Sequence, residues 1–190
     1  MLITNLATEP SRRKTIAAEI RESVTNIITG KIIDKAYLSG EVLSKAFTAL
    51  IAIAKDYATL DYLLSNESFR NECKDYVSKY DELIPKIVWI FELMSDKSSS
   101  FRKQFGPLYI PLILKKLTEN LSLEIIKSLL TLLKALLGSA ENVDIAGSNG
   151  AVLVLKQLSS NSDVRNEAPL AKLISSINKN ELGKFNIKKK

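Results

Sequence analysis

The stretch Leu121–Leu137, LSLEIIKSLLTLLKALL, is the most apolar in the chain. Its apolar residues cover most of the circumference of a helix, as expected for a helix that is buried on more than one side. Three charges interrupt it, and it is shorter than the roughly 20 apolar residues that span a bilayer, so we predict a buried helix of a soluble protein. Its polar residues follow one narrow stripe at helical spacing: Glu124, Lys127, Ser128, Thr131 and Lys134.

A second helical pattern repeats this one after 41 residues. At that shift, five apolar positions of 121–137 fall on apolar positions of 162–178. The pairs are Leu129 with Leu170, Leu130 with Ala171, Leu132 with Leu173, Leu133 with Ile174, and Leu136 with Ile177. A shift of 83 residues, about twice 41, relates 41–54 to 124–137. The spacing therefore indicates a helical repeat protein.

Two further segments carry a family resemblance. Gly150–Leu158, GAVLVLKQL, resembles the second-helix pattern of armadillo repeats, and Ser162–Ala168, SDVRNEA, resembles the start of their third helix. A repeat near 41 residues also lies in the armadillo and HEAT range. The chain thus resembles armadillo/HEAT-type helical repeat proteins, well over 108–178 and faintly before. The resemblance implies an all-α, right-handed α-solenoid. The residues also leave open an irregular helical bundle.

The rest of the chain is predicted to be helical as well, because seven Gly and five Pro are too few for the many tight turns of a strand-rich fold. Ser95–Ser100 is predicted to be a loop and Gly106–Pro107 a turn. We interpret residues 1–178 as a single helical-repeat domain, with 95–106 as the best candidate for a break, followed by a basic, flexible tail, 179–190. The expected helices are 11–29, 31–38, 41–64, 67–80, 83–94, 108–118, 121–137, 149–159 and 163–178.

The composition argues against an enzyme. The chain has no His, which removes the commonest general base and metal ligand, and its single Cys, Cys73, cannot form a metal cluster or an intrachain disulfide. No phosphate-binding loop, dinucleotide fingerprint or paired acidic motif is present. We therefore expect no catalytic residues, no metal and no cofactor, and we interpret Cys73 as a small packed residue.

The expected location is intracellular. Met1–Pro10 has no charged start followed by an apolar run, so we expect no signal peptide. A lone thiol suits a reducing compartment. We expect the cytoplasm, with the nucleus as the alternative.

The resemblance also bears on the mode of binding. Armadillo domains that bind extended peptides use an asparagine late in the third helix to clamp the ligand backbone. The matching positions here are Ala52, Ala135 and Ser176, so the extended-peptide clamp is not expected. A helix in a groove, or a flat contact between domains, is favoured instead.

The predicted function is that of a protein-interaction scaffold or adaptor. In armadillo proteins the polar stripe of the third helix lines the concave face, which places the predicted binding residues there. Most are basic, so an acidic partner segment or domain is expected. The alternative is binding to nucleic acid or an acidic membrane surface through the basic face and the lysine tail, given a net charge of +6. The predicted partner-binding residues are Lys127, Thr131, Lys134, Arg165 and Lys172.

Overall fold

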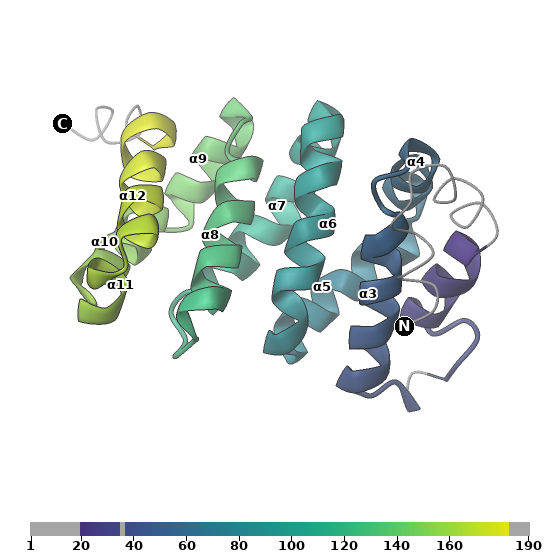
Figure 1. Cartoon of the computed structure of the whole chain (residues 1–190). Coiled ribbons are helices and arrows are strands. Elements are labelled where there is room, and N and C mark those ends of the chain that lie inside the picture. Colours follow the sequence, from purple (N-terminus) through teal and green to yellow (C-terminus); the bar gives the residue numbers. More distant parts are fainter. Residues whose placement is uncertain (1–19, 35–36, 183–190) are drawn as a thin grey trace. The chain divides into compact units, whose positions relative to one another are not determined.

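The computed structural model describes residues 20–34 and 37–182, which form an all-α structure without a strand (Figure 1). The helical class predicted from the sequence is confirmed over these residues. The chain divides into two compact units, residues 1–94 (unit 1) and 95–190 (unit 2). The described helices include none with the length and apolar character needed to cross a bilayer.

Unit 1 begins, within the described residues, with a helix over 20–28, the visible part of the helix expected over 11–29. Residues 11–19 of that prediction lie outside the described part of the chain. The elements that follow are α3 (Gly40–Ile53), α4 (Tyr57–Ser65), α5 (Glu67–Lys79), the 3-10 turn η2 (Asp81–Leu83) and α6 (Ile84–Lys97), whose last three residues belong to unit 2.

Two helix predictions in unit 1 are wrong. The single helix expected over 41–64 is broken, because the Asp56 carboxylate accepts a hydrogen bond of 3.0 Å from the Thr59 backbone N–H and starts α4 as a new helix. The helix expected over 31–38 is not formed by its described residues. Gly30 takes a left-handed φ of 70°, and the Lys31 N–H returns to the Asn26 carbonyl at 2.8 Å. This pairing ends the preceding helix and turns the chain away.

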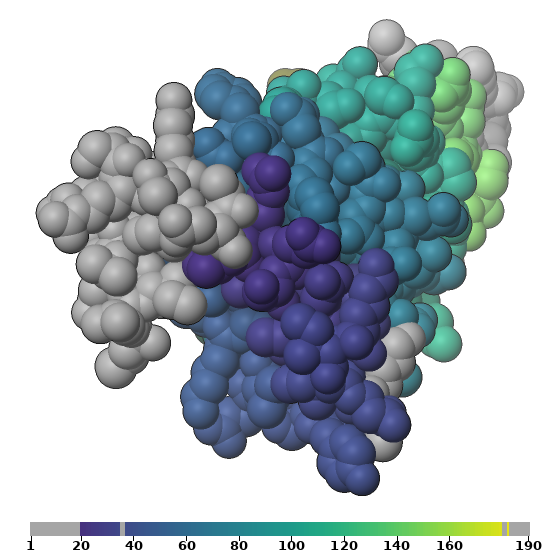
Figure 2. All heavy atoms as spheres, turned by 90° about the vertical axis from the view of Figure 1, so that its right-hand side faces the viewer, coloured from purple at the N-terminus to yellow at the C-terminus, as the bar shows by residue number. Residues whose placement is uncertain are grey.

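The core of unit 1 joins helices that are distant in sequence. The Phe47 ring of α3 packs against Phe69 and Tyr76 of α5, with ring centroids 6.4 Å apart in both pairs. The buried Tyr76 hydroxyl donates a 2.7 Å hydrogen bond to the Ile28 carbonyl, which fastens the helix over 20–28 to α5. On the surface, the Arg21 guanidinium lies 5.6 Å from the centre of the Tyr62 ring of α4. The space-filling view shows this N-terminal part in purple against blue residues (Figure 2).

Unit 2 is built from two layers of helices. The helices α8 and α12 pack side by side in one layer, and α7, α9 and α10 lie behind them (Figure 1). Each back helix contacts a neighbour: α7 meets α8 and α9, and α10 meets α9 and α12. The elements are α7 (Ser99–Lys116), α8 (Leu123–Leu136), α9 (Ala140–Ser148), α10 (Ala151–Ser160), α11 (Ser162–Asn166), α12 (Ala168–Ser176) and the π-helical turn η3 (Ile177–Glu181).

The expected loop at 95–100 and turn at Gly106–Pro107 are both wrong. Only Ser98 separates α6 from α7, and its side chain caps α7 by accepting the Phe101 N–H at 3.1 Å. α7 continues through Pro107 and Pro111. Each proline removes one N–H from the helix and leaves the carbonyl four residues earlier without its usual partner. Pro107 and Lys103 are both exposed. The Lys103 carbonyl, which lacks an N–H partner at Pro107, therefore lies on the solvent-facing side of the helix.

The buried side of α7 carries an aromatic ladder. Phe101 and Phe105 stack with centroids 3.9 Å apart, and Phe105 and Tyr109 stack at 5.6 Å. These rings recur every four residues, which is the spacing of one helix face. Their burial, together with that of Ile113 and Leu114 after the second proline, stabilises α7 as a helix through both prolines.

Asn142 in α9 connects three helices of unit 2. The residue is completely buried, and its Nδ2 donates two hydrogen bonds of 2.7 Å, one to the Arg102 carbonyl of α7 and one to the Leu136 carbonyl of α8. Leu136 is the last residue of α8, where carbonyls lack partners within the helix. The side chain therefore caps α8 and joins it to α7. α9 was not predicted from the sequence, because this short segment of mixed composition gives little periodic signal.

α8 is the buried helix that the sequence predicted. Its apolar residues Leu129, Leu130, Leu132, Leu133 and Leu136 are all at most 1% exposed. Ser122 caps its start by accepting the Ile125 N–H. The helix expected over 163–178, in contrast, is broken at Glu167. Pro169, in the first turn of α12, has no N–H to continue the hydrogen bonding of α11.

Candidate functional site: a basic helical face and an end pocket

The polar stripe of α8 is on the surface. Lys127 and Lys134 are exposed and stand two helical turns apart, about 10 Å along the axis. The Thr131 hydroxyl between them is partly buried and donates a 2.8 Å hydrogen bond to the Lys127 carbonyl. Thr131 is therefore engaged with its own helix, and the two ammonium groups are the exposed positive charges of this stripe. Glu124, also exposed, is the acid at the start of the helix.

The neighbouring helix α12 adds a third lysine. Lys172 is exposed, and its helix packs directly against α8. The ammonium groups of Lys127, Lys134 and Lys172 have no hydrogen bond or ion pair with any residue that the structure describes. We call these three lysines the basic face. In the same unit, the buried Lys116 ammonium is neutralised by Glu119 at 2.9 Å.

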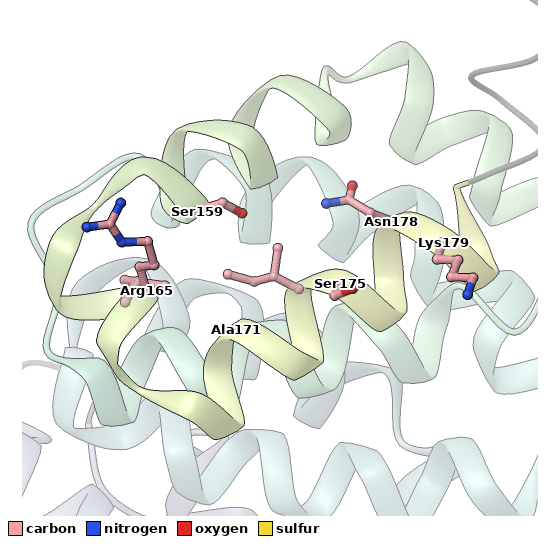
Figure 3. Close-up of a pocket in the computed structure, with 8 residues that line it drawn as sticks. Ser159, Arg165, Ala171, Ser175, Asn178 and Lys179 are labelled. Atoms are coloured by element: carbon pink, nitrogen blue, oxygen red, sulfur yellow. The ribbon is translucent and has the colours of Figure 1, made fainter.

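Arg165 does not lie on the same helix as Lys172. It belongs to the short α11, before the break at Glu167, and it lines a pocket at the end of unit 2 (Figure 3). The predicted site is thus divided: Lys127, Thr131, Lys134 and Lys172 are placed on two adjoining helices, whereas Arg165 is in the pocket next to them.

This end pocket has a volume of about 470 Å³. Its apolar floor contains Val164 and Ile174, which are 1% and 2% exposed. The pocket was not predicted from the sequence, although Ala171, Ser175 and Asn178 recur at helical spacing on one side of 163–178. The lining residues are Ser159, Val164, Arg165, Ala171, Ile174, Ser175, Asn178 and Lys179.

No family model matches the sequence, and no curated protein is significantly similar to it.

The net charge of the chain is concentrated in unit 2. Residues 95–190 contain 15 Lys and Arg against 8 Asp and Glu, a formal charge of +7. Residues 1–94 contain 12 against 13, a formal charge of −1. The exposed lysines of α8 and α12 thus lie in a strongly basic unit, whose positive potential extends over distances near the Debye length.

Cys73 is completely buried in unit 1, and this burial raises the pKa of its thiol well above the usual range. A raised thiol pKa lowers the fraction of the nucleophilic thiolate. Within the described ranges, no three His, Cys, Asp or Glu side chains are grouped so that they could hold a metal ion.

Proposed function

We propose that the chain is a non-catalytic protein-interaction module of the armadillo/HEAT-like α-solenoid type, in which the basic face of unit 2 docks an acidic segment or domain of a partner protein. The solenoid assignment is supported by the order of elements in unit 2. A short helix (α9) is followed by α10 and then by α12, which packs beside α8 at the position of the 41-residue repeat. In solenoids, each repeat buries its apolar side against its neighbours.

The binding proposal rests on one observation: exposed lysines extend from a helix whose other side is buried in the core. Lys127 and Lys134 extend from α8, whose opposite side consists of fully buried leucines. The core therefore fixes the backbone positions from which these two lysines extend. Since Lys172 is on the adjoining α12 and none of the three has an acidic partner among the described residues, an incoming carboxylate meets no competing acid from these helices except Glu124.

The proposal is tested by charge reversal. We expect the double variant Lys127→Glu/Lys134→Glu to bind a synthetic Asp/Glu-rich peptide with an association rate several-fold lower than the wild type, because long-range attraction acts on association. The matched control is Lys55→Glu/Lys156→Glu, which changes the net charge equally at two other exposed lysines that have no ion pair with a described residue. Equal slowing in both variants would mean that net charge alone matters.

Hydrogen exchange then maps the footprint of the peptide. We expect protection in α8 and α12. Protection confined to α7, α9 and α10, together with normal binding by Lys127→Glu/Lys134→Glu, would overturn the proposal. A parallel titration with random-sequence duplex DNA addresses the nucleic-acid alternative. DNA that binds more tightly than the peptide and with a steep salt dependence would favour that alternative instead.

A further inference from the structure

The end pocket combines an apolar floor with donors that have no partner among the described residues. The Arg165 guanidinium, the Lys179 ammonium, the Ser175 hydroxyl and the Asn178 amide make no hydrogen bond or ion pair with any described residue. Among the residues whose side chains the structure describes, no Asp or Glu lines the pocket. The pocket therefore has positive charges and hydrogen-bond donors around a floor of buried aliphatic side chains.

A second concavity in unit 2 differs from the end pocket, because its cations have partners within the protein. It has a volume of about 280 Å³ and lies where α7 and α9 begin. There, Glu141 pairs with Lys103 at 3.4 Å, and the Arg102 guanidinium donates to the Ser95 carbonyl. Its cations are already engaged, in contrast to those of the end pocket.

The backbone near the end pocket is unusual as well. Asn178 and Lys179 belong to the π-helical turn Ile177–Glu181, which follows directly on α12. π-Helical turns are rare and often mark functional sites. Both residues line the end pocket. The same turn contains the first three residues of the predicted tail, 179–190.

The cations are separated, which limits the ligands that fit. Arg165 and Lys179 lie at opposite ends of the pocket, and Ser159, Ser175 and Asn178 lie between them (Figure 3). A compact anion such as phosphate is bound best by donors that converge on one point. An elongated ligand with a carboxylate at each end and an apolar group in the middle matches this arrangement, since the floor is apolar.

We infer that the end pocket holds one apolar side chain of an acidic partner segment, with carboxylates on either side of it reaching Arg165 and Lys179. This inference rests on the proposed function and adds a sequence preference to it. The basic face would supply attraction without sequence specificity, and the pocket would select segments in which an apolar residue is flanked by Asp or Glu. Burial of that side chain contributes affinity that charge alone cannot give.

Two synthetic peptides test the inference. Both are 15-residue Asp/Glu-rich peptides with the same net charge, and they differ only in a central Leu or Ser. We expect the Leu peptide to bind the wild-type protein about tenfold more tightly, the ratio expected from partial burial of one leucine. The variant Ser175→Trp, at an exposed position on the pocket wall, should abolish this ratio while it leaves the affinity of the Ser peptide unchanged. Its matched control is Ser148→Trp, at an exposed position outside the pocket.

The charges are tested separately. The double variant Arg165→Glu/Lys179→Glu should lower the affinity for the Leu peptide more than Lys55→Glu/Lys156→Glu does. Thermal melts of all variants establish that they fold. Equal binding of the two peptides to the wild type would overturn the inference and leave the acidic-partner proposal standing. A tenfold preference that survives Ser175→Trp would also overturn it. Failure of both peptides to bind at low ionic strength would overturn both proposals.

Discussion

Gly106 lies directly against the side chain of Asn142: a Cβ added at Gly106 would stand only 1.9 Å from the Asn142 Oδ1 atom. The contact brings α7 and α9 together at a point where both residues are buried. Since Asn142 is held there by its two hydrogen bonds to carbonyls of α7 and α8, it cannot move aside without breaking them.

The first prediction concerns this contact. Replacing a glycine inside a helix with alanine normally stabilises a protein by about 1 kcal/mol. We expect Gly106→Ala to have the opposite sign and to lower the free energy of unfolding by about 1–3 kcal/mol, because the added methyl group overlaps Asn142. Urea denaturation followed by circular dichroism measures the change. A stabilised variant would contradict the close approach.

A double-mutant cycle isolates the cause. Asn142→Ala alone should cost about 2–4 kcal/mol, because the Arg102 and Leu136 carbonyls lose their donor. The double variant Gly106→Ala/Asn142→Ala should cost clearly less than the sum of the two single variants, since removing the amide makes room for the methyl group. If the two single costs simply add, the destabilisation by Gly106→Ala does not arise from its contact with Asn142.

The second prediction concerns the core of α8. Leu133 is fully buried, and we expect Leu133→Ala to lower the free energy of unfolding by about 2–5 kcal/mol, as truncation of a buried leucine does. The matched control is Leu153→Ala in α10, where the side chain is 60% exposed and should cost far less. A loss below about 1 kcal/mol for Leu133→Ala would mean that α8 is peripheral.

The third prediction concerns alkaline pH. Burial is the main cause that raises the pKa of the Cys73 thiol above its ordinary value of 9.0 and that of the Tyr76 phenol above its ordinary value of 10.0. The folded state therefore keeps protons that the unfolded state releases. The stability linked to these groups is complete below those ordinary values and falls as the pH rises through them, by up to about 1.4 kcal/mol per pH unit for each group.

Urea midpoints measured at about pH 8 and about pH 10.5 test this dependence. Tyr76→Phe should reduce the alkaline loss, although at neutral pH it costs about 1–2 kcal/mol through the missing hydrogen bond to the Ile28 carbonyl. Tyr57→Phe, at a side chain that is 74% exposed, should behave like the wild type at both pH values. An identical alkaline loss in Tyr76→Phe and in the wild type would show that the Tyr76 hydroxyl contributes nothing to it.

The fourth prediction concerns the reactivity of Cys73. A buried thiol with a raised pKa should react with a thiol reagent only when unit 1 opens, so labelling should be slow in buffer and fast in urea. A variant that carries Ser160→Cys in a Cys73→Ser background provides the exposed reference and should label at once. Comparable rates for the two thiols in buffer would contradict the burial of Cys73.

The helices were predicted best where their interiors are strongly periodic. α8 extends over most of the predicted 121–137, and α5 matches 67–80. Breaks between helices were predicted less well, because single side chains decide them. Asp56 starts a new helix within an apolar run, and Pro169 interrupts 163–178. Pro107, conversely, is accommodated inside α7, because a ladder of buried aromatic rings outweighs the loss of one hydrogen bond.

The candidate site was predictable only in part. The stripe on α8 follows from the periodicity of one helix, so Lys127 and Lys134 are on the surface as the pattern requires. The location of Arg165 could not be predicted, since it depends on where α11 ends. The pocket next to it depends on a π-helical turn, and this turn has no recognisable sequence pattern. Tertiary packing, rather than local preference, determines both features.

Asn142 also has a consequence for how unit 2 comes apart. Stacked helices that contact only their neighbours tend to open one after another. A single side chain that bonds carbonyls of both α7 and α8 from α9 opposes such stepwise opening. Amide protons in these three helices should therefore exchange as one cooperative block, whereas those of α12 and the π-helical turn should exchange first. A partner bound at the end of unit 2 would then stabilise the helices that open most readily.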